Sequence, residues 1–171
     1  THSSIWCIVK DNQGTLWLGT YFGGVNYFNP EYEIYTRYSY SSNEKKGLSN
    51  PVVGRTIEDR DGNLWIGTEG GGLNYYNRRT REFKWYRPQE GRNSISHNNV
   101  KALYYDADKE IIWIGTHLGG LNKLDIRSGH FTHYRMEEGN PNTLPSDIIR
   151  DIIPYKSLLI IATQNGVCLF D

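Results

Sequence analysis

The sequence predicts an all-β fold made of repeated four-stranded units, and three observations carry this prediction. Tryptophan recurs at a step of 48 residues, as Trp17, Trp65 and Trp113. Other residue types keep the same step around it: Gly19, Gly67 and Gly115; Asn26, Asn74 and Asn122; and Tyr38, Tyr86 and Tyr134. No segment has a sustained helical period, so almost no helix is expected. Four short strands per unit at this repeat length are typical of β-propeller blades.

Strands are expected near residues 5–10, 15–20, 25–29 and 34–38, and at the matching positions of the later units. In the second unit, DRDGN joins the first two strands as a tight hairpin, because Asp and Gly suit such a turn. Glycines 70–72 form the next turn, where a positive φ carries no Cβ penalty. RRTR makes the third turn, and PQEGRNSISHNN is a long loop to the next unit.

Both faces of a strand are apolar in this sequence, which fits a blade packed between two neighbours. In LWIGT, Leu64 and Ile66 share one face, while Trp65 and Gly67 share the other. Gly67 leaves room for an indole or for a facing blade. We therefore expect the recurring tryptophans to be buried between blades.

The units span about 5–48, 53–96, 100–145 and 149–171, and together form one propeller segment over residues 1–171. The fourth unit is degraded and stops early: Ile160 replaces the tryptophan and Ala162 the glycine. The chain opens without Met, so we interpret it as a fragment of a larger sensor region. Open apolar blade faces and a bare strand edge favour self-association, for example two segments completing one ring.

Charge and composition exclude some classes of protein. The chain has 19 basic and 19 acidic side chains, so a globally basic nucleic-acid binder is not expected. It contains no apolar run long enough for a transmembrane helix, so any membrane attachment would come through flanking segments. Cys7 and Cys168 are interpreted as small buried apolar residues, with a disulfide as the alternative.

The repeated motif resembles a known family. DRDGNLWIGTEGGGLNYYNRRTREFKWYR is similar to the two-component regulator propeller repeat, and D-x-x-G-x-L-W-x-G-T followed by G-G-(L/V)-N carries the resemblance. The fourth unit, with PYKSLLIIAT, departs from it. The resemblance implies an extracytoplasmic, periplasmic sensor region of a bacterial hybrid histidine kinase, many of which come from glycan-degrading gut bacteria. It implies a non-catalytic segment that senses a glycan or a related signal for a kinase parent.

Motifs that suggest chemistry have simpler explanations here. DRDGN resembles the opening of a calcium loop, but the twelfth residue from Asp59 is Gly70 rather than an acid. His130 and His133 fall on opposite faces of a predicted outer strand, which does not suit a metal pair. No hydrolase elbow, phosphate loop or zinc-protease motif occurs, so no catalytic residue, cofactor or metal is expected. NRRTR (77–81) is interpreted as a solvated hairpin tip.

Positions that vary inside the fixed frame supply the candidate site. After the fixed Thr of each unit come Tyr21, Glu69, His117 and Gln164. Near the start of the first strand one column reads Trp6, Gly54, Lys101 and Arg150, and the next reads Cys7, Arg55, Ala102 and Asp151. The first strand of a blade lines the central channel, and both sets should meet at one channel mouth. The candidate ligand-binding residues are Arg55, Lys101, Arg150, Asp151, Tyr21, Glu69, His117 and Gln164.

Three functions stay open: a ligand-sensing module, a protein–protein or dimerisation scaffold, and a propeller lyase or hydrolase. The cations of the predicted mouth favour an anionic ligand such as an acidic sugar, and Tyr21 offers a ring on which a sugar could stack. The competing interpretation is that Asp151 pairs with Arg150 or Arg55 and leaves no free charge, or that all these residues are ordinary solvated loop positions.

Overall fold

The computed structural model describes residues 4–32 and 34–171 and consists of four antiparallel β-sheets. The strands are, in chain order, β1 (Ile5–Lys10), β2 (Leu16–Thr20), β3 (Gly24–Asn29), β4 (Ile34–Tyr38), β5 (Val53–Glu58), β6 (Leu64–Thr68), β7 (Leu73–Asn77), β8 (Glu82–Tyr86), β9 (Val100–Asp106), β10 (Ile111–Thr116), β11 (Leu121–Asp125), β12 (Phe131–Tyr134), β13 (Ile149–Tyr155), β14 (Leu158–Thr163) and β15 (Gly166–Phe170). The only helix in this described part of the chain is the short 3-10 turn η1 (Glu44–Lys46).

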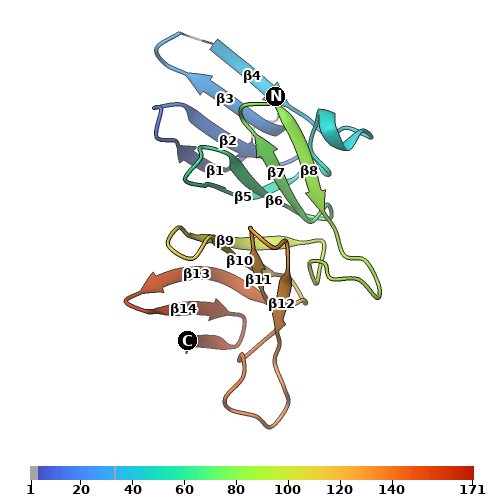
Figure 1. Ribbon diagram of the computed structural model, residues 1–171, viewed down its shortest axis with the longest axis vertical. Helices are drawn as coiled ribbons and strands as arrows, with labels where there is room; N and C mark the ends of the chain where they lie inside the picture. The colour runs from blue at the N-terminus through green and yellow to red at the C-terminus, as the bar shows by residue number, and fades with distance from the viewer. Residues whose placement is uncertain (1–3, 33) are drawn as a thin grey trace.

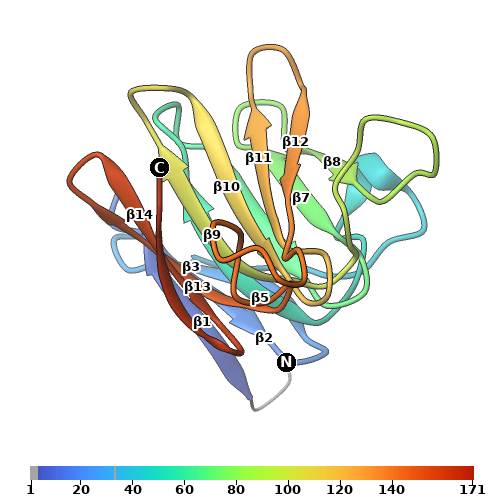
Figure 2. The same ribbon diagram turned by 90° about the horizontal axis from the view of Figure 1, so that it is seen from below.

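Each sheet is a meander whose strands follow chain order; we call the four sheets blades 1 to 4. The first three blades have four strands and the last has three. The first strands of neighbouring blades pack together, β1 with β5, β5 with β9 and β9 with β13. Figure 1 shows the blades one below another with the two chain ends far apart, and Figure 2 shows the four first strands gathered away from β8 and β12. The predicted propeller segment with an incomplete last blade is confirmed.

An aspartate closes the first hairpin and also fixes the tryptophan. Oδ1 of Asp11 accepts hydrogen bonds from the backbone N–H groups of Gln13 and Thr15, at 2.9 and 2.8 Å. Its Oδ2 accepts from the indole Nε1 of Trp17 at 2.7 Å, and blade 2 repeats this aspartate–indole contact at 3.1 Å. Oδ1 of Asp59 likewise accepts from the backbone N–H groups of Asp61 and Asn63, at 3.0 and 2.9 Å, so the prediction that DRDGN serves as a turn is confirmed.

The recurring tryptophans are buried between blades, as predicted. Trp17, Trp65 and Trp113 have exposed fractions of only 5%, 2% and 8%. Trp17 of blade 1 belongs to one apolar cluster with Val53 and Leu64 of blade 2, and the other two tryptophans have the same relation to the blade that follows each of them. Each indole therefore fills the space between its own blade and the next.

The glycine two residues after each tryptophan sets how closely the blades approach. A Cβ atom on Gly67 would lie 2.5 Å from Cγ1 of Val100, the first residue of β9. We call the first strand of each blade its inner strand. A Cβ atom added to Gly19 of blade 1 or Gly115 of blade 3 would lie 2.6 or 2.4 Å from the first residue of the inner strand of the next blade. Real Cβ atoms do not come so close to other carbons, so any side chain here would push two blades apart.

A hydrogen-bonded pair of asparagine and serine, which we call the polar clamp, recurs in blade 2 and blade 3. Its loss accounts for part of the sequence divergence of blade 4. The side-chain amide of Asn74 accepts from the N–H of Ser49 and donates to its Oγ, both at 2.8 Å, and blade 3 repeats both bonds with an identical pair. By strand register, Cys168 stands at the asparagine position of blade 4. Pro145, which has no N–H to donate, follows Leu144 as Ser49 follows Leu48. Both partners of the clamp are thus replaced together.

Both cysteines are free thiols and half-buried. Burial raises the pKa of Cys7 and of Cys168, and in Cys7 it outweighs the opposing effect of the hydrogen bond with Thr56. Their interpretation as small apolar residues fits this environment, and the disulfide alternative is wrong.

Replacing Trp65 with Ala is expected to lower the free energy of unfolding by about 3–5 kcal/mol, the usual range for removing a large buried side chain. Urea unfolding followed by circular dichroism measures this loss. Trp6→Ala is the matched control, because Trp6 is 48% exposed and should change stability far less. Equal stabilities of the Trp65→Ala protein and the unmodified chain would contradict the packing described above.

Gly67→Ala is expected to cost about 1–3 kcal/mol, because the new methyl group overpacks the contact with Val100. Adding Val100→Ala removes the γ-carbons and should restore part of this loss, although the Cβ of Val100 still lies 2.9 Å away. A double-mutant cycle by urea unfolding measures this coupling. If the two single costs simply add, the close approach does not limit the blade spacing.

Candidate functional site

The inner strand of every blade carries a β-bulge at the same place. Pairing with the second strand shifts register between Ile5 and Cys7 in blade 1, and the corresponding shifts occur in the other three blades. The residues left at these four bulges are Trp6, Gly54, Lys101 and Arg150. Bulges re-aim side chains and are frequent next to binding sites. In all four blades, the bulge therefore removes one variable residue of the repeat from regular strand pairing.

The second variable column follows directly after the bulge. Arg55 and Asp151 lie opposite the glycine or alanine of the second strand, with Gly67 and Ala162 as their register partners. Their side chains are about half exposed, at 49% and 48%. Small residues on the neighbouring strand thus leave these two charged groups accessible.

The residue after the fixed Thr is held beside the start of the inner strand in each blade. The N–H of Glu69 donates to the carbonyl of Val52, and His117 donates to Asn99, both at 3.0 Å. Tyr21 and Gln164 make the matching bonds in blades 1 and 4, to the carbonyls of Ser4 and Ile148. This repeated bond places the turn after the second strand and the beginning of the first strand at one end of each blade. We call this end of the four blades the channel mouth.

Most charges at the channel mouth are paired. Lys101 forms an ion pair with Glu69 of the preceding blade. Arg55 lies 3.7 Å from Asp151, which connects blades 2 and 4 across the inner strands. Arg150 donates to the neutral amide oxygen of Gln164 at 3.1 Å. Two of the three cations named by the sequence therefore have an acidic partner. The pairing of Asp151 with Arg55 is the competing interpretation considered from the sequence.

Aromatic rings border the paired charges. The rings of Trp6 and Tyr21 stack with centroids 4.9 Å apart and an interplanar angle of 23°, and Phe22 meets Tyr21 edge-on at 4.4 Å. Trp6 and Phe22 remain 48% and 55% exposed. Sequence reasoning placed Trp6 in a variable column but did not select it, and it missed Phe22. The signal for both was available, since large exposed aromatic side chains in a polar rim are typical of binding surfaces.

A cavity of about 460 Å³ lies at the part of the mouth formed by blades 1 to 3. It is lined by Ile5, Trp6, Gly54, Arg55, Glu69 and Lys101. Three of the eight predicted site residues thus share one hollow, and the other five do not line it: Tyr21, His117, Arg150, Asp151 and Gln164. The predicted set is brought to one end of the segment, but only part of it shares a single cavity.

Two histidines form a second group at the mouth. The rings of His97 and His117 meet edge-on with centroids 6.4 Å apart. Burial lowers the pKa of His97, and the nearby His117 and Arg135 lower it further. Nδ1 of His117 is buried and has no hydrogen-bond partner among the described residues. His97 lies in an inter-blade loop, and only the tertiary structure brings it to His117.

The interpretation of NRRTR as a solvated hairpin tip is wrong for Arg78. Its Nη2 donates to Oδ2 of Asp11 at 2.8 Å and lies 3.5 Å from Glu58. Its guanidinium also lies over the ring of Trp17, 5.5 Å from the centroid. Burial disfavours the charged form of Asp11, but hydrogen bonds from Trp17 and Thr15 and the Arg78 charge prevail and hold its pKa below the usual value. Arg78 thus ties the turn of blade 2 to the first hairpin of blade 1.

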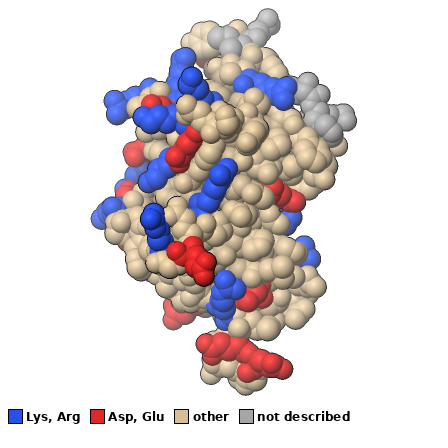
Figure 3. Space-filling view, turned by 90° about the vertical axis from the view of Figure 1, so that its right-hand side faces the viewer, with Lys and Arg blue, Asp and Glu red and all other residues tan. Residues whose placement is uncertain are grey.

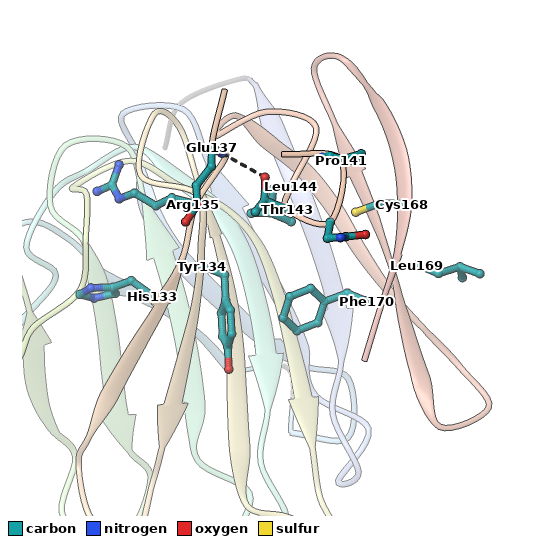
Figure 4. A pocket seen from close by; sticks show the side chains of 11 residues that line it. His133, Tyr134, Arg135, Glu137, Pro141, Thr143, Leu144, Cys168, Leu169 and Phe170 are labelled. Carbon is teal, nitrogen blue, oxygen red and sulfur yellow. Dashed lines mark hydrogen bonds between the residues drawn. The ribbon is translucent and has the colours of Figure 1, made fainter. Parts of the chain in front are cut away.

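A further cavity, of about 450 Å³, lies between the end of β12 and β15 (Figure 4). Its walls come from β12, from the loop over residues 137–144 and from β15, as shown by Tyr134, Leu144 and Phe170. In blades 2 and 3 the preceding loop binds the fourth strand of the blade, for example through Glu44 and Trp85. Blade 4 has three strands among the described residues, so the loop before it borders this hollow beside β15 instead of binding a fourth strand.

Metal sites and membrane-spanning helices are both absent from the described residues. These residues contain no group of three or more His, Cys, Asp or Glu side chains that could hold a metal ion. Within residues 4–32 and 34–171, no helix is long and apolar enough to cross a membrane. Acidic and basic side chains are interspersed over the face seen in Figure 3, in keeping with a chain of zero net charge.

The family model of the two component regulator propeller matches residues 1–22, 47–70 and 94–117. Each match covers the start of one unit: the inner strand, the first hairpin and the second strand with the fixed Gly-Thr. These are the parts that hold the bulge, the aspartate–indole contact and the blade-spacing glycine. No curated protein sequence matches the chain.

Solved structures from B. thetaiotaomicron share this fold. The extracellular domain of a putative hybrid two component system is 25% identical with a TM-score of 0.82, and the match covers all of this chain but 25% of that one. The extracellular domain of a putative one component system is 23% identical with a TM-score of 0.77, covering 97% of this chain and 21% of that one. The chain thus spans about a quarter of the length of these structures.

Virginiamycin B lyase from Staphylococcus aureus also shares the fold, with a TM-score of 0.69, 14% identity and coverage of 99% of this chain and 56% of that one. That likeness concerns the fold alone, since propellers carry unrelated functions. The hybrid-system domain is similar in both sequence and structure, and the family model agrees with it. The first parts of blades 1 to 3 therefore match the two component regulator propeller family, and the whole chain is similar to the extracellular domain of a putative hybrid two component system.

Proposed function

We propose that this chain is a non-catalytic, ligand-sensing segment of the periplasmic region of a bacterial two-component sensor, with a histidine kinase as the parent protein. The signal is a glycan or a related molecule, bound at the channel mouth. The observation that carries the proposal is the bulge repeated in all four inner strands, which presents one variable residue per blade at the same end of the segment. A repeated scaffold that displays different side chains at one position is suited to recognition.

The side chains at the mouth fit a sugar. The stacked rings of Trp6 and Tyr21 offer an apolar face, on which the carbon–hydrogen face of a pyranose can pack. Next to them, the Glu69–Lys101 and Arg55–Asp151 pairs offer several donors and acceptors within a small area. Sugars combine one apolar face with a rim of hydroxyl groups, so an aromatic wall beside fixed polar groups is complementary to them.

The charges of the mouth also bear on the enzyme alternative. Both acids, Glu69 and Asp151, stand in ion pairs with cations. Each carboxylate is thus already engaged by a neighbouring cation, and no third titratable group of the described mouth joins either pair. This arrangement supports binding over acid–base catalysis.

The proposed ligands include acidic sugars because of the charge of Arg150. Its partner Gln164 is a neutral amide, so that contact leaves the guanidinium charge uncancelled, unlike the charges of Arg55 and Lys101. A carboxylate or sulfate can accept two parallel hydrogen bonds from a guanidinium group. We therefore place the preference for an anionic ligand on Arg150.

Calorimetry of the whole chain with neutral and acidic oligosaccharides tests the site. Trp6→Ala should weaken binding of both kinds of sugar, since it removes the stacking face. Arg150→Gln should weaken the acidic sugar alone, by roughly tenfold or more, as expected for a lost charge-assisted hydrogen bond. Added salt should reduce only the acidic interaction.

Tyr35→Ala is the matched control for that experiment, because Tyr35 is 54% exposed on β4, away from the mouth. Arg55→Ala and Lys101→Ala break the two ion pairs and should weaken binding of either sugar. Binding that ignores Trp6→Ala, Arg55→Ala and Lys101→Ala alike would remove the mouth as the site.

Exposed apolar side chains on the two end blades favour a second role, as an association scaffold. Ile8 on blade 1 is 62% exposed, and Ile153 and Leu169 on blade 4 are 50% and 62% exposed. The face with Ile153 corresponds to the faces by which blades 1 to 3 pack on the next blade. The last blade of one copy can therefore pack on the first blade of another in the geometry used inside the chain, and two copies would supply eight blades, within the usual range of rings.

Light scattering over a range of concentrations tests this association. The mass is expected to rise with concentration, and Leu169→Lys should suppress the rise by placing a charge on the end face. Leu118→Lys is the control, since Leu118 is also exposed, at 56%, but lies on a turn at the mouth. A mass of one chain at every concentration would rule out the scaffold role for this segment.

A further inference from the structure

A separate cavity lies between blades 1 and 2, at the end of the strands opposite the channel mouth. Its volume is about 240 Å³, and its walls include the first hairpin of blade 1 and the last turn of blade 2. Pockets for drug-sized ligands usually measure roughly 300–1,000 Å³, so this one suits a smaller molecule. We call it the inter-blade cleft.

Aromatic rings form the walls of the inter-blade cleft. Trp17, Tyr27 and Tyr38 come from blade 1 and Tyr76 from blade 2. The rings of Trp17 and Tyr27 have centroids 5.1 Å apart, and those of Tyr38 and Tyr76 are 4.9 Å apart. The two hydroxyl groups of Tyr38 and Tyr76 are hydrogen-bonded at 2.6 Å. Tyr27 and Tyr38 are half-buried and thus keep part of each ring open to the cleft.

Two arginines close the cleft on the side of blade 2. The Nη2 atom of Arg78 is bound to Asp11, but its Nε is buried and has no hydrogen-bond partner among the described residues. Arg81 is exposed, and no ion pair of its side chain is found within the described part of the chain. One buried donor and one unpaired charge therefore meet the same aromatic cleft. A buried donor without a partner is costly, and an anion would satisfy it.

The cleft between blades 2 and 3 lacks this chemistry. The residue that matches Arg78 there is Ile126, which packs against the cluster around Trp65. The residue that matches Arg81 is Gly129, and Leu124 stands in place of Tyr76. Neither arginine thus belongs to the repeated sequence frame. Arg78 ties blade 2 to Asp11 of blade 1, whereas no ion pair gives Arg81 such a role within the described part of the chain.

We propose that the inter-blade cleft binds a single pyranose unit that carries a carboxylate, that is, a hexuronate. The sugar ring packs on Tyr27 and Tyr38, and the carboxylate is held by Arg81 and by the Nε of Arg78. This site is distinct from the channel mouth and does not depend on it. Aromatic faces select the ring, and the guanidinium groups select the acid.

The test uses the full chain with methyl β-D-glucuronide, methyl β-D-glucoside and sodium sulfate as probes, followed by calorimetry and tryptophan fluorescence. The glucuronide is expected to bind and to change the fluorescence, because Trp17 lies in the wall of the cleft. The glucoside and sulfate should each bind at least roughly tenfold more weakly, since each lacks one half of the contacts. Glucuronide binding no tighter than that of either other probe would overturn the proposal.

Variants assign the binding to the cleft. Arg81→Gln should weaken the glucuronide by roughly tenfold or more while leaving the glucoside unchanged. Arg79→Gln is the matched control, because Arg79 is an exposed arginine of the same turn that does not line the cleft. Tyr27→Phe keeps the ring and should retain binding, whereas Tyr27→Ala should lose it. Equal losses from Arg79→Gln and Arg81→Gln, or glucuronide binding that Tyr27→Ala leaves unchanged, would show that the cleft is not the site.

Discussion

The close approach of one blade to the next depends on a residue that has no side chain. The glycine after each buried tryptophan faces the first residue of the following inner strand, with less space than a methyl group needs. This contact sets the spacing of β1, β5, β9 and β13, and therefore the position of everything at their ends. The tryptophan beside it fills the wider part of the gap. The tryptophan and the glycine, two residues apart on one strand face, together determine the shape of the interface between blades.

Hydrogen bonds from side chains to turns keep this interface in register. An aspartate closes the first hairpin and binds the indole of the same blade, so the turn and the buried ring are held together. Arg78 extends the contact from blade 2 to the aspartate of blade 1. An asparagine clamp holds the loop that enters each of blades 2 and 3. In blade 4, both the asparagine and its serine partner are replaced, so the clamp is lost as a whole.

A rigid repeated frame leaves two ends of each blade free to vary. At the mouth, the bulges display one residue per blade, and the repeated backbone bond holds a second variable residue next to it. At the opposite end, the turns between outer strands vary in length and charge, and there two arginines meet the tyrosines of the preceding blade. The proposed glycan site and the proposed hexuronate cleft use these two ends. Both depend on the same spacing of blades, because each draws side chains from neighbouring units.

The sequence by itself determined the strands, the turns, the burial of the tryptophans and the incomplete last blade. Local hydrogen bonding and the alternation of strand faces produce these features, and repetition made them visible. It also named residues that the fold brings to one end, such as Arg55 and Glu69. Only the tertiary structure decided that Arg55 pairs with Asp151, two blades away, and that Arg78 is bound between blades rather than solvated. Such pairs join residues dozens of positions apart, and their choice of partner depends on blade spacing and burial, which no local pattern encodes.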